Sequence, residues 1–503
     1  MKKHTEALLD VPPGERQLFL DDCGIDRIEG LSRSLHQPEK KGAVIRPDRL
    51  WESVLQTRCA PAWDAEEEVF KLWMITSTPF PGVAGTTVAT SRDGVHWEKP
   101  ILRQMEVNGS LENNFVTVDP KLTWAANAIT NVVIDPDDPD PARRYKGLGH
   151  CDGREPLVSP DGIHWQRLDV PKIPSGDEAN LSYDRPSRTF IAAVKHGGPY
   201  GRSVFLSTSQ DFERWSDPEL VFHADDRDQE RGHTHIARRF ADPALKTPEH
   251  HTPEHYNVDV YNMGIFRYEG LFIGLPSLFH QTGKVSKDWE GFDGMGLSPE
   301  ILDAVRQYGD WTGFHHVQLA CSRDLHHWDR VGDRQPFIDA SPAGSGAYDL
   351  QCIIGPSSPV VRGTELWFYY TGIKHYAYVS SDQGDSGAIC LAVLRRDGFV
   401  SLDAGDEKGV LVTRSFVLTG DSLFVNCDAS NGEVSVQVMQ RDGRVVAASE
   451  PITGDQLRER IHWAEGGLSA LRGQKVTLRF SLRNARLYSY WVAQGGASGP
   501  AQG

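Results

Sequence analysis

One short motif occurs four times along the chain and limits what the chain can fold into. Each copy reads Ser-x-Asp-x-x-x-Trp, and the copies begin at Ser91, Ser159, Ser209 and Ser322. Asp accepts hydrogen bonds from backbone groups just ahead of it, so the motif predicts a tight turn between two short strands. A hairpin that recurs along a chain is typical of stacked β units, of which the propeller blade is the natural candidate.

This interpretation gives the motif residues structural roles. The four aspartates are expected to be turn residues, and the four tryptophans are expected to pack between neighbouring blades. These residues are Asp93, Asp161, Asp211 and Asp324, with Trp97, Trp165, Trp215 and Trp328.

The spacing of the copies, with the short β-type runs between them, predicts five blades. The copies begin 68, 50 and 113 residues apart, so the last interval is about twice the others. We interpret this interval as a single blade, the fourth, with two insertions at residues 222–257 and 279–316. A fifth unit follows the last copy, with residues 358–361 as its expected inner strand.

The sequence changes in character beyond about residue 403, where short alternating segments and tight turns predict an antiparallel β-sandwich. The expected fold class is therefore all-β, a five-bladed β-propeller followed by a C-terminal β-sandwich. The expected domains are a segment that closes the propeller or bridges the domains (1–50), the catalytic propeller (51–402), the sandwich (403–494) and a disordered tail (495–503).

Composition and charge exclude several classes of partner. The formal charge is −16 and no basic run occurs, which disfavours nucleic acid as a partner. The N-terminus lacks the apolar core of a signal peptide, and no run is long enough for a membrane span, so we expect a cytoplasmic protein without membrane contact. Seven scattered cysteines fit reduced core thiols better than disulfides or a structural zinc site.

Acidic residues cluster where the chain enters the inner strands of the blades. If each first strand lines the central channel, these entrances and both insertions open on one face, where long connections on a rigid scaffold carry function. The candidate catalytic carboxylates there are Asp177, Asp259, Glu52, Asp349 and Glu178. Cleavage of a glycosidic bond needs one protonated carboxyl group and one ionised one, and we take Asp177 and Asp259 as the leading pair.

The strand around Asp259 suggests which side chains accompany it. Period-two alternation predicts that Asp259, Tyr261 and Met263 point to the same side. Aromatic rings can stack on the apolar face of a sugar, and polar side chains can bind its hydroxyl groups. The candidate substrate-binding residues are Trp51, Arg58, Asn114, Asn180, Tyr261, Trp311, His315 and Gln318. The expected partner is a small carbohydrate substrate, and the edges of the sandwich also allow a homo-oligomer.

Histidines gather in the fourth blade and suggest an alternative chemistry. His233, His235 and His255 are weak candidates for ligands of a divalent ion, although no spacing matches a zinc signature. We expect no cofactor. A metal-assisted carbohydrate lyase or hydrolase remains one alternative, and a non-catalytic propeller that binds glycans is another.

The chain resembles the five-bladed glycoside hydrolases of families 32, 43 and 68, and most of all a bacterial group described as family-32-like. Besides the hairpin motif, the resemblance is carried by residues 17–22, 36–39, 135–145, 266–270 and 394–402. The family 32 motifs Asn-Asp-Pro-Asn-Gly, Arg-Asp-Pro and Glu-Cys are absent, and only Asp177-Glu178 is similar to the third of them. The resemblance therefore implies the fold and carbohydrate chemistry, without fructosidase activity or its catalytic triad. The sequence is best interpreted as a cytoplasmic glycoside hydrolase that acts on a small oligosaccharide or glycoside.

Overall fold

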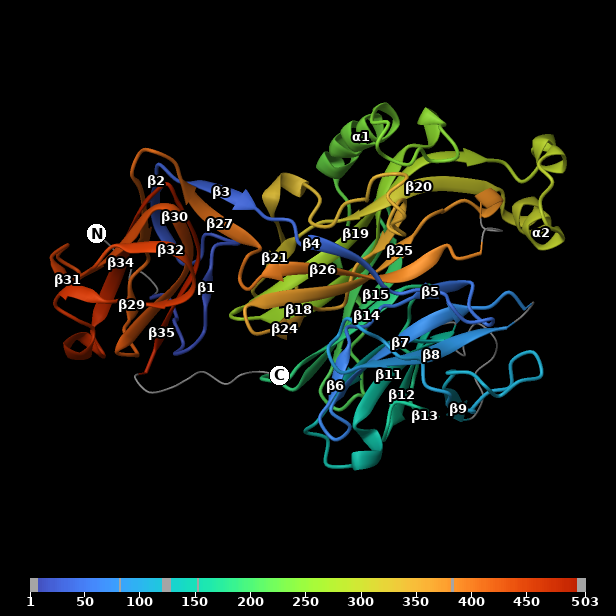
Figure 1. Ribbon diagram of the computed structural model, residues 1–503, viewed down its shortest axis with the longest axis horizontal. Helices are drawn as coiled ribbons and strands as arrows, with labels where there is room; N and C mark the ends of the chain where they lie inside the picture. The colour runs from blue at the N-terminus through green and yellow to red at the C-terminus, as the bar shows by residue number, and fades with distance from the viewer. Residues whose placement is uncertain (1–7, 81–82, 120–127, 152, 381–383, 495–503) are drawn as a thin grey trace.

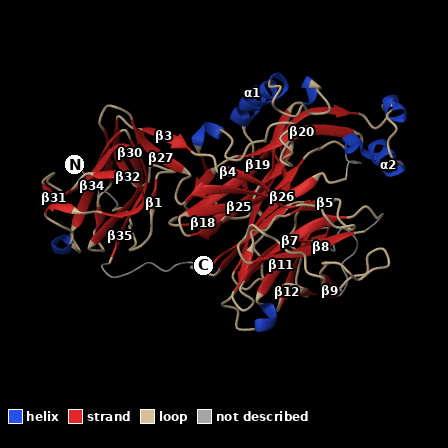
Figure 2. Ribbon diagram, viewed as in Figure 1, coloured by secondary structure: helices blue, strands red, loops and turns tan. Residues whose placement is uncertain are grey.

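The computed structural model describes residues 8–80, 83–119, 128–151, 153–380 and 384–494, and the expected tail at 495–503 lies outside these ranges. The described chain is almost entirely β-structure, with two α-helices and a few 3-10 turns at the periphery (Figures 1 and 2). Neither of these helices is long and apolar enough to cross a membrane. The expected fold class, a five-bladed propeller with a β-sandwich, is confirmed by the pairing of the strands.

Each blade is an antiparallel sheet whose first strand lies innermost. Blade one contains β5 (Val54–Gln56), β7 (Val69–Ser77) and β8 (Ala84–Ser91), with β6 (Ala62–Asp64) paired to β7. Blade two contains β10 (Ile129–Ile134), β11 (Tyr145–Cys151), β12 (Gly153–Ser159) and β13 (His164–Arg167), and β9 (Thr117–Asp119) adds a parallel strand. Blade three contains β14 (Ala179–Asp184), β15 (Thr189–Gly198), β16 (Gly201–Ser209) and β17 (Glu219–Phe222).

Blades four and five depart from the simplest pattern. Blade four contains β18 (Asn257–Tyr268), β19 (Leu271–Val285), β20 (Asp310–Val317), β21 (Ala320–Ser322) and β22 (Asp329–Arg330). Blade five contains β23 (Cys352–Ile354), β24 (Val360–Arg362), β25 (Glu365–Ile373) and β26 (Gly387–Arg395), with β4 (Glu39–Ile45) from the N-terminal segment paired to β26. A strand from before blade one thus completes the last blade of the ring.

The expected inner strand of blade five, residues 358–361, is wrong. The inner strand is β23, whose three residues are all buried, while β24 pairs with the opposite end of β25. A fully buried strand shows no alternation of polar and apolar residues, so the sequence pattern gives no sign of it.

The repeated motif forms the same hairpin in all four places, as expected. In the first copy, Asp93 Oδ1 accepts hydrogen bonds from the backbone N–H groups of Val95 and His96, each at 2.8 Å. The indole of Trp97 donates to the carbonyl oxygen of Gly94 at 3.0 Å. The same bonds recur at Asp161, Asp211 and Asp324. These aspartates are therefore turn residues rather than channel carboxylates.

The motif tryptophans connect blades. Trp165 of blade two meets Trp73 of blade one edge to face, with ring centroids 6.4 Å apart. Gly162 has φ of +79°, and a Cβ atom there would lie 2.5 Å from the Trp73 ring. Only glycine fits this combination of a left-handed backbone and close approach. The motif thus fixes both the turn and the packing of one blade on the next.

The twelve strands of the sandwich are joined by hydrogen bonds into one connected set. Three of them come from the N-terminal segment. These are β1 (Gln17–Leu18), β2 (Ile25–Glu29) and β3 (Ser32–Leu35). The others are β27 (Val400–Ala404), β28 (Gly409–Thr413), β29 (Phe416–Val417), β30 (Ser422–Met439), β31 (Val445–Ser449), β32 (Ile452–Arg460), β33 (Trp463–Glu465), β34 (Lys475–Arg483) and β35 (Ala485–Ala493). Its core is a separate cluster of apolar side chains, which identifies it as a second folding unit.

A buried carboxylate joins the propeller to the sandwich. Asp397, at the turn after β26, accepts hydrogen bonds from Tyr268 of blade four and from Ser489 of β35, each at 2.6 Å. Asn426 of β30 donates to it at 3.2 Å, and Arg16 forms an ion pair with it. Groups from both domains thus satisfy one buried charge, which fixes the domains against each other.

Both insertions of blade four lie at the end of the blade where β18 begins. The first contains α1 (Asp226–Ala241), which starts with a capping box and reaches the backbone of Val258 through Gln229. The second is built differently from the loop that the sequence suggests, because β19 and β20 continue through it as a paired arm. The arm ends in η4 (Glu290–Gly294) and α2 (Pro299–Tyr308), at the upper right in Figure 1.

Candidate functional site

A β-bulge at Tyr261 determines which side chains face the channel. The register of β18 against β19 shifts between Val260 and Asn262, so Tyr261 is an extra residue without a partner opposite it. Met263 packs in the same apolar cluster as Val260 and so lies on the opposite side of the strand from Asp259. The expectation that Asp259, Tyr261 and Met263 share one side is therefore wrong. A bulge reverses the alternation, and bulges often reorient side chains beside active sites.

Asp259 is held in a two-pronged ion pair. Its two carboxylate oxygens accept hydrogen bonds from Nε and Nη2 of Arg202 at 2.8 and 2.9 Å, and the backbone N–H of Arg202 donates at 3.3 Å. The Arg202 guanidinium also lies over the rings of Tyr261 and Phe279, at 5.1 and 4.7 Å from their centroids. These contacts hold the Arg202 guanidinium group in one position, between the Asp259 carboxylate and the two aromatic rings.

Glu178 and Asp177 are neighbours in sequence with different surroundings. The buried Glu178 carboxylate accepts hydrogen bonds from Nε and Nη2 of Arg58, each at 2.6 Å. Burial alone would raise the pKa of Glu178, but the charge and hydrogen bonds of Arg58 hold it below its usual value. The side chain of Asp177 is 65% exposed, and its Oδ1 lies 2.6 Å from Nζ of Lys195. Partial desolvation opposes ionisation here too, but Lys195 lowers the pKa of Asp177.

Lys195 lies between these carboxylates and the Tyr261 ring. Its side chain is only 6% exposed, and Nζ lies 4.1 Å from the centroid of the Tyr261 ring. Burial lowers the pKa of Lys195, while the charges of Glu178 and Asp177 partly restore it. Burial and the nearby Glu178 charge raise the pKa of Tyr261 well above its usual value, so the phenol keeps its proton. An ionised carboxylate, a buried ammonium group and a protonated phenol therefore lie side by side.

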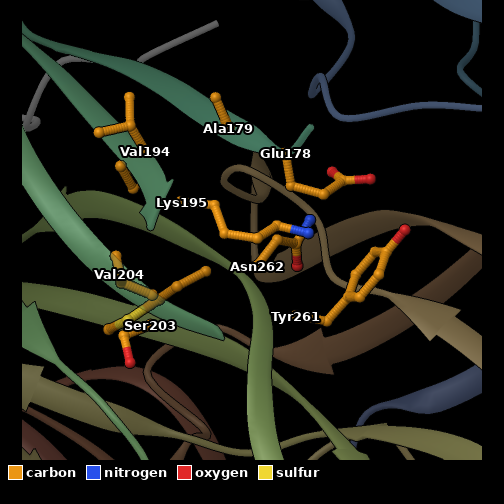
Figure 3. A pocket seen from close by; sticks show the side chains of 10 residues that line it. Glu178, Ala179, Val194, Lys195, Ser203, Val204, Tyr261 and Asn262 are labelled. Carbon is orange, nitrogen blue, oxygen red and sulfur yellow. The ribbon is translucent and has the colours of Figure 1, made fainter. Parts of the chain in front are cut away.

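A small cavity lies between strands β14, β15 and β16 of blade three and β18 of blade four. It holds about 10 Å³, the room of about one water molecule. Glu178, Lys195, Tyr261 and Asn262 gather at one end of it, and Ser203 lies at the other end (Figure 3).

Two buried amides beside this cluster have unused hydrogen-bonding capacity. Within the described part of the chain, both side-chain polar atoms of Asn180 and of Asn262 are buried without a hydrogen-bond partner. Asn180 lies in β14 directly after Ala179, and Asn262 follows the bulge in β18. Leaving such groups unsatisfied costs free energy, so they indicate a place where water or ligand hydroxyl groups bind.

A series of ring contacts leads away from Tyr261 through His315 and Tyr376. His315 lies 4.7 Å from Tyr261 and 5.3 Å from Tyr376, measured between ring centroids. Tyr376 stacks on Phe279 at 4.8 Å and is within hydrogen-bonding reach of Trp311. Burial and the charge of Arg202 hold the pKa of His315 well below its usual value, so His315 is a neutral wall residue.

Of the remaining predicted residues, three form a separate group in blade one. Glu52 pairs with Lys99 at 2.6 Å and accepts backbone hydrogen bonds from Asp48 and Arg49. The indole of Trp51 donates to Asn114 at 3.0 Å. These contacts satisfy Trp51 and Asn114 within blade one, and none of them reaches the Glu178 cluster.

Asp349 and Gln318 also have protein partners of their own. Asp349 pairs with Lys40 at 2.7 Å and accepts a hydrogen bond from Tyr370 at 2.8 Å. Gln318 is buried between His316 and Arg330. The structure thus gathers Asp177, Glu178, Asp259, Arg58, Tyr261, His315 and Trp311 of the predicted set through a series of contacts. Asn180 follows two residues after Glu178, in β14.

Four residues of the site escape sequence reasoning, namely Lys195, Arg202, Asn262 and Tyr376. Lys195 gives one usable signal, because it follows five apolar residues in β15, where a charge needs a partner. Arg202 and Tyr376 reach the site from loops and strand ends, and Asn262 depends on the bulge.

The histidines proposed as metal ligands do not converge. His233 and His235 lie on α1, where residues two apart point in different directions, and His255 is exposed in η3 (Pro253–His255). Across the described ranges, no group of three His, Cys, Asp or Glu side chains could hold a metal ion. His235 instead lies against His280 and His316, with centroids 4.5 to 5.4 Å apart among the three rings.

Acidification is expected to destabilise the fold through these three histidines. Burial lowers the pKa of each, and two of them have pKa values well below the usual value of 6.5. The native state therefore binds fewer protons than the unfolded state, and the free energy of unfolding falls as pH drops below about 6.5. Each of the two strongly shifted histidines contributes about 2 kcal/mol by pH 5, so we expect a loss of about 4 kcal/mol between pH 7 and pH 5, measured by urea unfolding.

Two variants test whether the three histidines cause this loss of stability on acidification. The charged groups around the cluster are Arg231, Arg238, Arg239 and Asp339. His316→Gln removes one buried imidazole and is expected to flatten the pH dependence, whereas His462→Gln, at an exposed position, leaves it unchanged. Equal pH dependence in wild type and His316→Gln would show that the cluster is not responsible.

Comparison with known proteins finds similar folds at low sequence identity. No protein-family model and no curated protein matches the chain. A solved glycoside hydrolase has a TM-score of 0.42 and 12% identity, and the alignment covers 71% of this chain and 92% of that one. A GH32 beta-fructofuranosidase of Bombyx mori has a TM-score of 0.41 and 9% identity over 92% of this chain and 95% of that one. A family 43 arabinoxylan arabinofuranohydrolase of Bacillus subtilis has a TM-score of 0.37 and 11% identity over 90% and 99%.

The Bombyx mori and Bacillus subtilis enzymes are of the family 32 and 43 types that the sequence resembles. All of the TM-scores lie below 0.5 and the identities are low, so they assign no activity to this chain. The function proposed below rests on the residues of this chain.

Proposed function

We propose that the protein is a glycoside hydrolase that cleaves a glycosidic bond in a small oligosaccharide or glycoside. The observation that carries this proposal is an exposed, ionised Asp177 held by Lys195, together with two buried, unpartnered amides in the adjoining strands, Asn180 of β14 and Asn262 of β18. Each amide offers both donors and acceptors, which suits the hydroxyl groups of a neutral sugar. The Tyr261 ring lines the same cavity as Asn262, with the Lys195 ammonium group 4.1 Å from its centroid.

The chemistry assigned to Asp177 follows from its charge and exposure. Lys195 keeps the carboxylate ionised, and its exposed position allows it to attack the anomeric carbon or to take a proton from water. Lys195 also holds Asp177 above Tyr261, because its ammonium group touches both.

The leaving oxygen needs a proton, and Tyr261 is the group we assign to supply it. Burial and the nearby Glu178 charge raise its pKa well above the usual value, so the phenol carries its proton before the reaction. The Lys195 and Arg202 cations beside the ring would stabilise the phenolate that the transfer leaves. Asp259 acts through Arg202, whose guanidinium lies over the same ring. Glu178 acts through Arg58, whose positive charge favours ionisation of Tyr261. In this proposal Asp259 and Glu178 are positioning residues, and Asp177 and Tyr261 touch the substrate.

A panel of aryl glycosides and di- to hexasaccharides, incubated with the purified protein, tests the proposal. We expect release of a reducing sugar from at least one substrate, and chelation by EDTA is expected to leave the rate unchanged. Saturable binding without product would instead support a glycan-binding propeller. Activity lost on chelation and restored by a divalent ion would support the metal-assisted alternative.

A further inference from the structure

We propose that the arm of blade four extends the site, so that the substrate is a saccharide chain of at least three sugar units. This inference rests on the proposed function and adds the length of the substrate. It starts from a continuous series of aromatic side chains, here called the aromatic track, which comprises Tyr261, Tyr376, Trp311, Tyr378 and Tyr308.

The contacts along the aromatic track lead from Tyr261 in the candidate site to Tyr308 at the end of the arm. His315 touches both Tyr261 and Tyr376, and Tyr376 is within hydrogen-bonding reach of Trp311. Trp311 meets the ring of Tyr378 edge to face at 5.6 Å. Tyr378 begins η6 (Tyr378–Ser380), which contacts α2, and Tyr308 is the last residue of α2.

Packing of the arm explains only part of this series. The arm is anchored where the Asp310 carboxylate accepts hydrogen bonds from the backbone of Tyr378, at 2.8 Å, and pairs with His250, at 2.7 Å. α2 lies against η6 at the same place. Tyr308, however, is 54% exposed at the end of α2, so its ring is available to a ligand.

The occupant is inferred from continuity with the candidate site. Rings that follow one another from a sugar-sized site offer successive stacking surfaces for a chain of sugar rings. His315 and Trp311 lie in one strand, four residues and thus about 13 Å apart, a length that one monosaccharide cannot span. The arm would therefore bind the units beyond the bond that is cleaved.

Titration calorimetry with oligosaccharides of increasing length tests the inference through binding alone. The probes are malto-, xylo-, arabino- and fructo-oligosaccharides of two to six units. In the Asp177→Asn background, which is expected to keep substrate affinity with little turnover, the pentasaccharide of one series is expected to bind at least tenfold more tightly than the disaccharide. Tyr308→Ala is expected to lose about two- to tenfold of pentasaccharide affinity, while Tyr308→Phe, which keeps the ring, retains it.

The outcomes separate this inference from the proposed function. Hydrolysis with equal affinity for two and five units, or full pentasaccharide affinity in Tyr308→Ala, would overturn the aromatic track alone. Length-dependent binding without hydrolysis of any probe would overturn the proposed function and support the track. No binding and no hydrolysis in any series would overturn both.

Discussion

Asp177→Asn is expected to lower kcat on a cleaved glycoside about 1,000-fold, because it removes the charge that attacks or activates water. The side chain is 65% exposed and pairs with Lys195, so the fold should survive the change. Circular dichroism and the midpoint of thermal unfolding check that it does. The variant should bind substrate with affinity close to that of wild type, since the hydroxyl-binding amides remain.

A matched control and a pH profile sharpen this prediction. Asp217→Asn, at an exposed position in the same blade, is expected to leave kcat unchanged. Because the pKa of Asp177 is lowered, its charge persists through the usual range of carboxyl titration. Activity should therefore not fall between pH 7 and pH 5 through protonation of Asp177. Full turnover by Asp177→Asn on a true substrate would remove Asp177 from the reaction.

Arg58→Met is expected to lower the free energy of unfolding by about 3–5 kcal/mol, because it leaves the buried Glu178 carboxylate without its countercharge. Urea unfolding at pH 7 measures the loss. The double variant Arg58→Met, Glu178→Leu removes both charges and is expected to recover most of it, since an apolar pair of similar volume often replaces a buried ion pair without cost.

The pH dependence of this pair has a definite sign. The pKa of Glu178 lies below its usual value in the folded protein. The stability that the pair contributes is therefore fully present above about pH 4.5 and is lost as pH falls through the folded-state pKa. Arg58→Met should show a weaker loss of stability on acidification than wild type. If the single variant is as stable as wild type, Arg58 and Glu178 do not form the pair described above.

The repeated hairpin explains why the fold could be predicted from sequence. Ser91 and its three counterparts mark turns whose hydrogen bonds are local, so the same letters give the same hairpin each time. Five blades follow from counting these units. The inner strand β23 was missed because its residues are buried on both sides and so show no alternation.

The site was predictable only in part, for a different physical reason. Acidic residues at strand entrances, such as Asp177 and Glu178, could be found because blade topology gathers those entrances. The cations that hold them come from other strands and other blades: Arg58 from blade one, and Lys195 and Arg202 from blade three. Pairings of this kind depend on tertiary register, which a single sequence does not reveal.

The bulge at Tyr261 shows most clearly what could not be predicted from the sequence. Strict alternation along β18 predicts Met263 beside Asp259, whereas the one extra residue places Met263 in the apolar cluster of Val260. Asn262, the residue after the bulge, lines the cavity. The sequence Asn-Val-Asp-Val-Tyr-Asn-Met contains no pattern that predicts the bulge. Yet the bulge gives the site a buried amide that the proposed sugar binding uses.

The central claim, hydrolysis of a glycosidic bond with Asp177, is tested most directly by mass spectrometry of products formed in ¹⁸O-labelled water. Wild type incubated with the saccharide panel is predicted to release a sugar that carries one ¹⁸O atom at its anomeric carbon, and Asp177→Asn is predicted to release almost none. Cleavage products without the label would mean that the bond breaks by elimination, and binding without any product would mean that the propeller only recognises glycans. Either result would contradict the account.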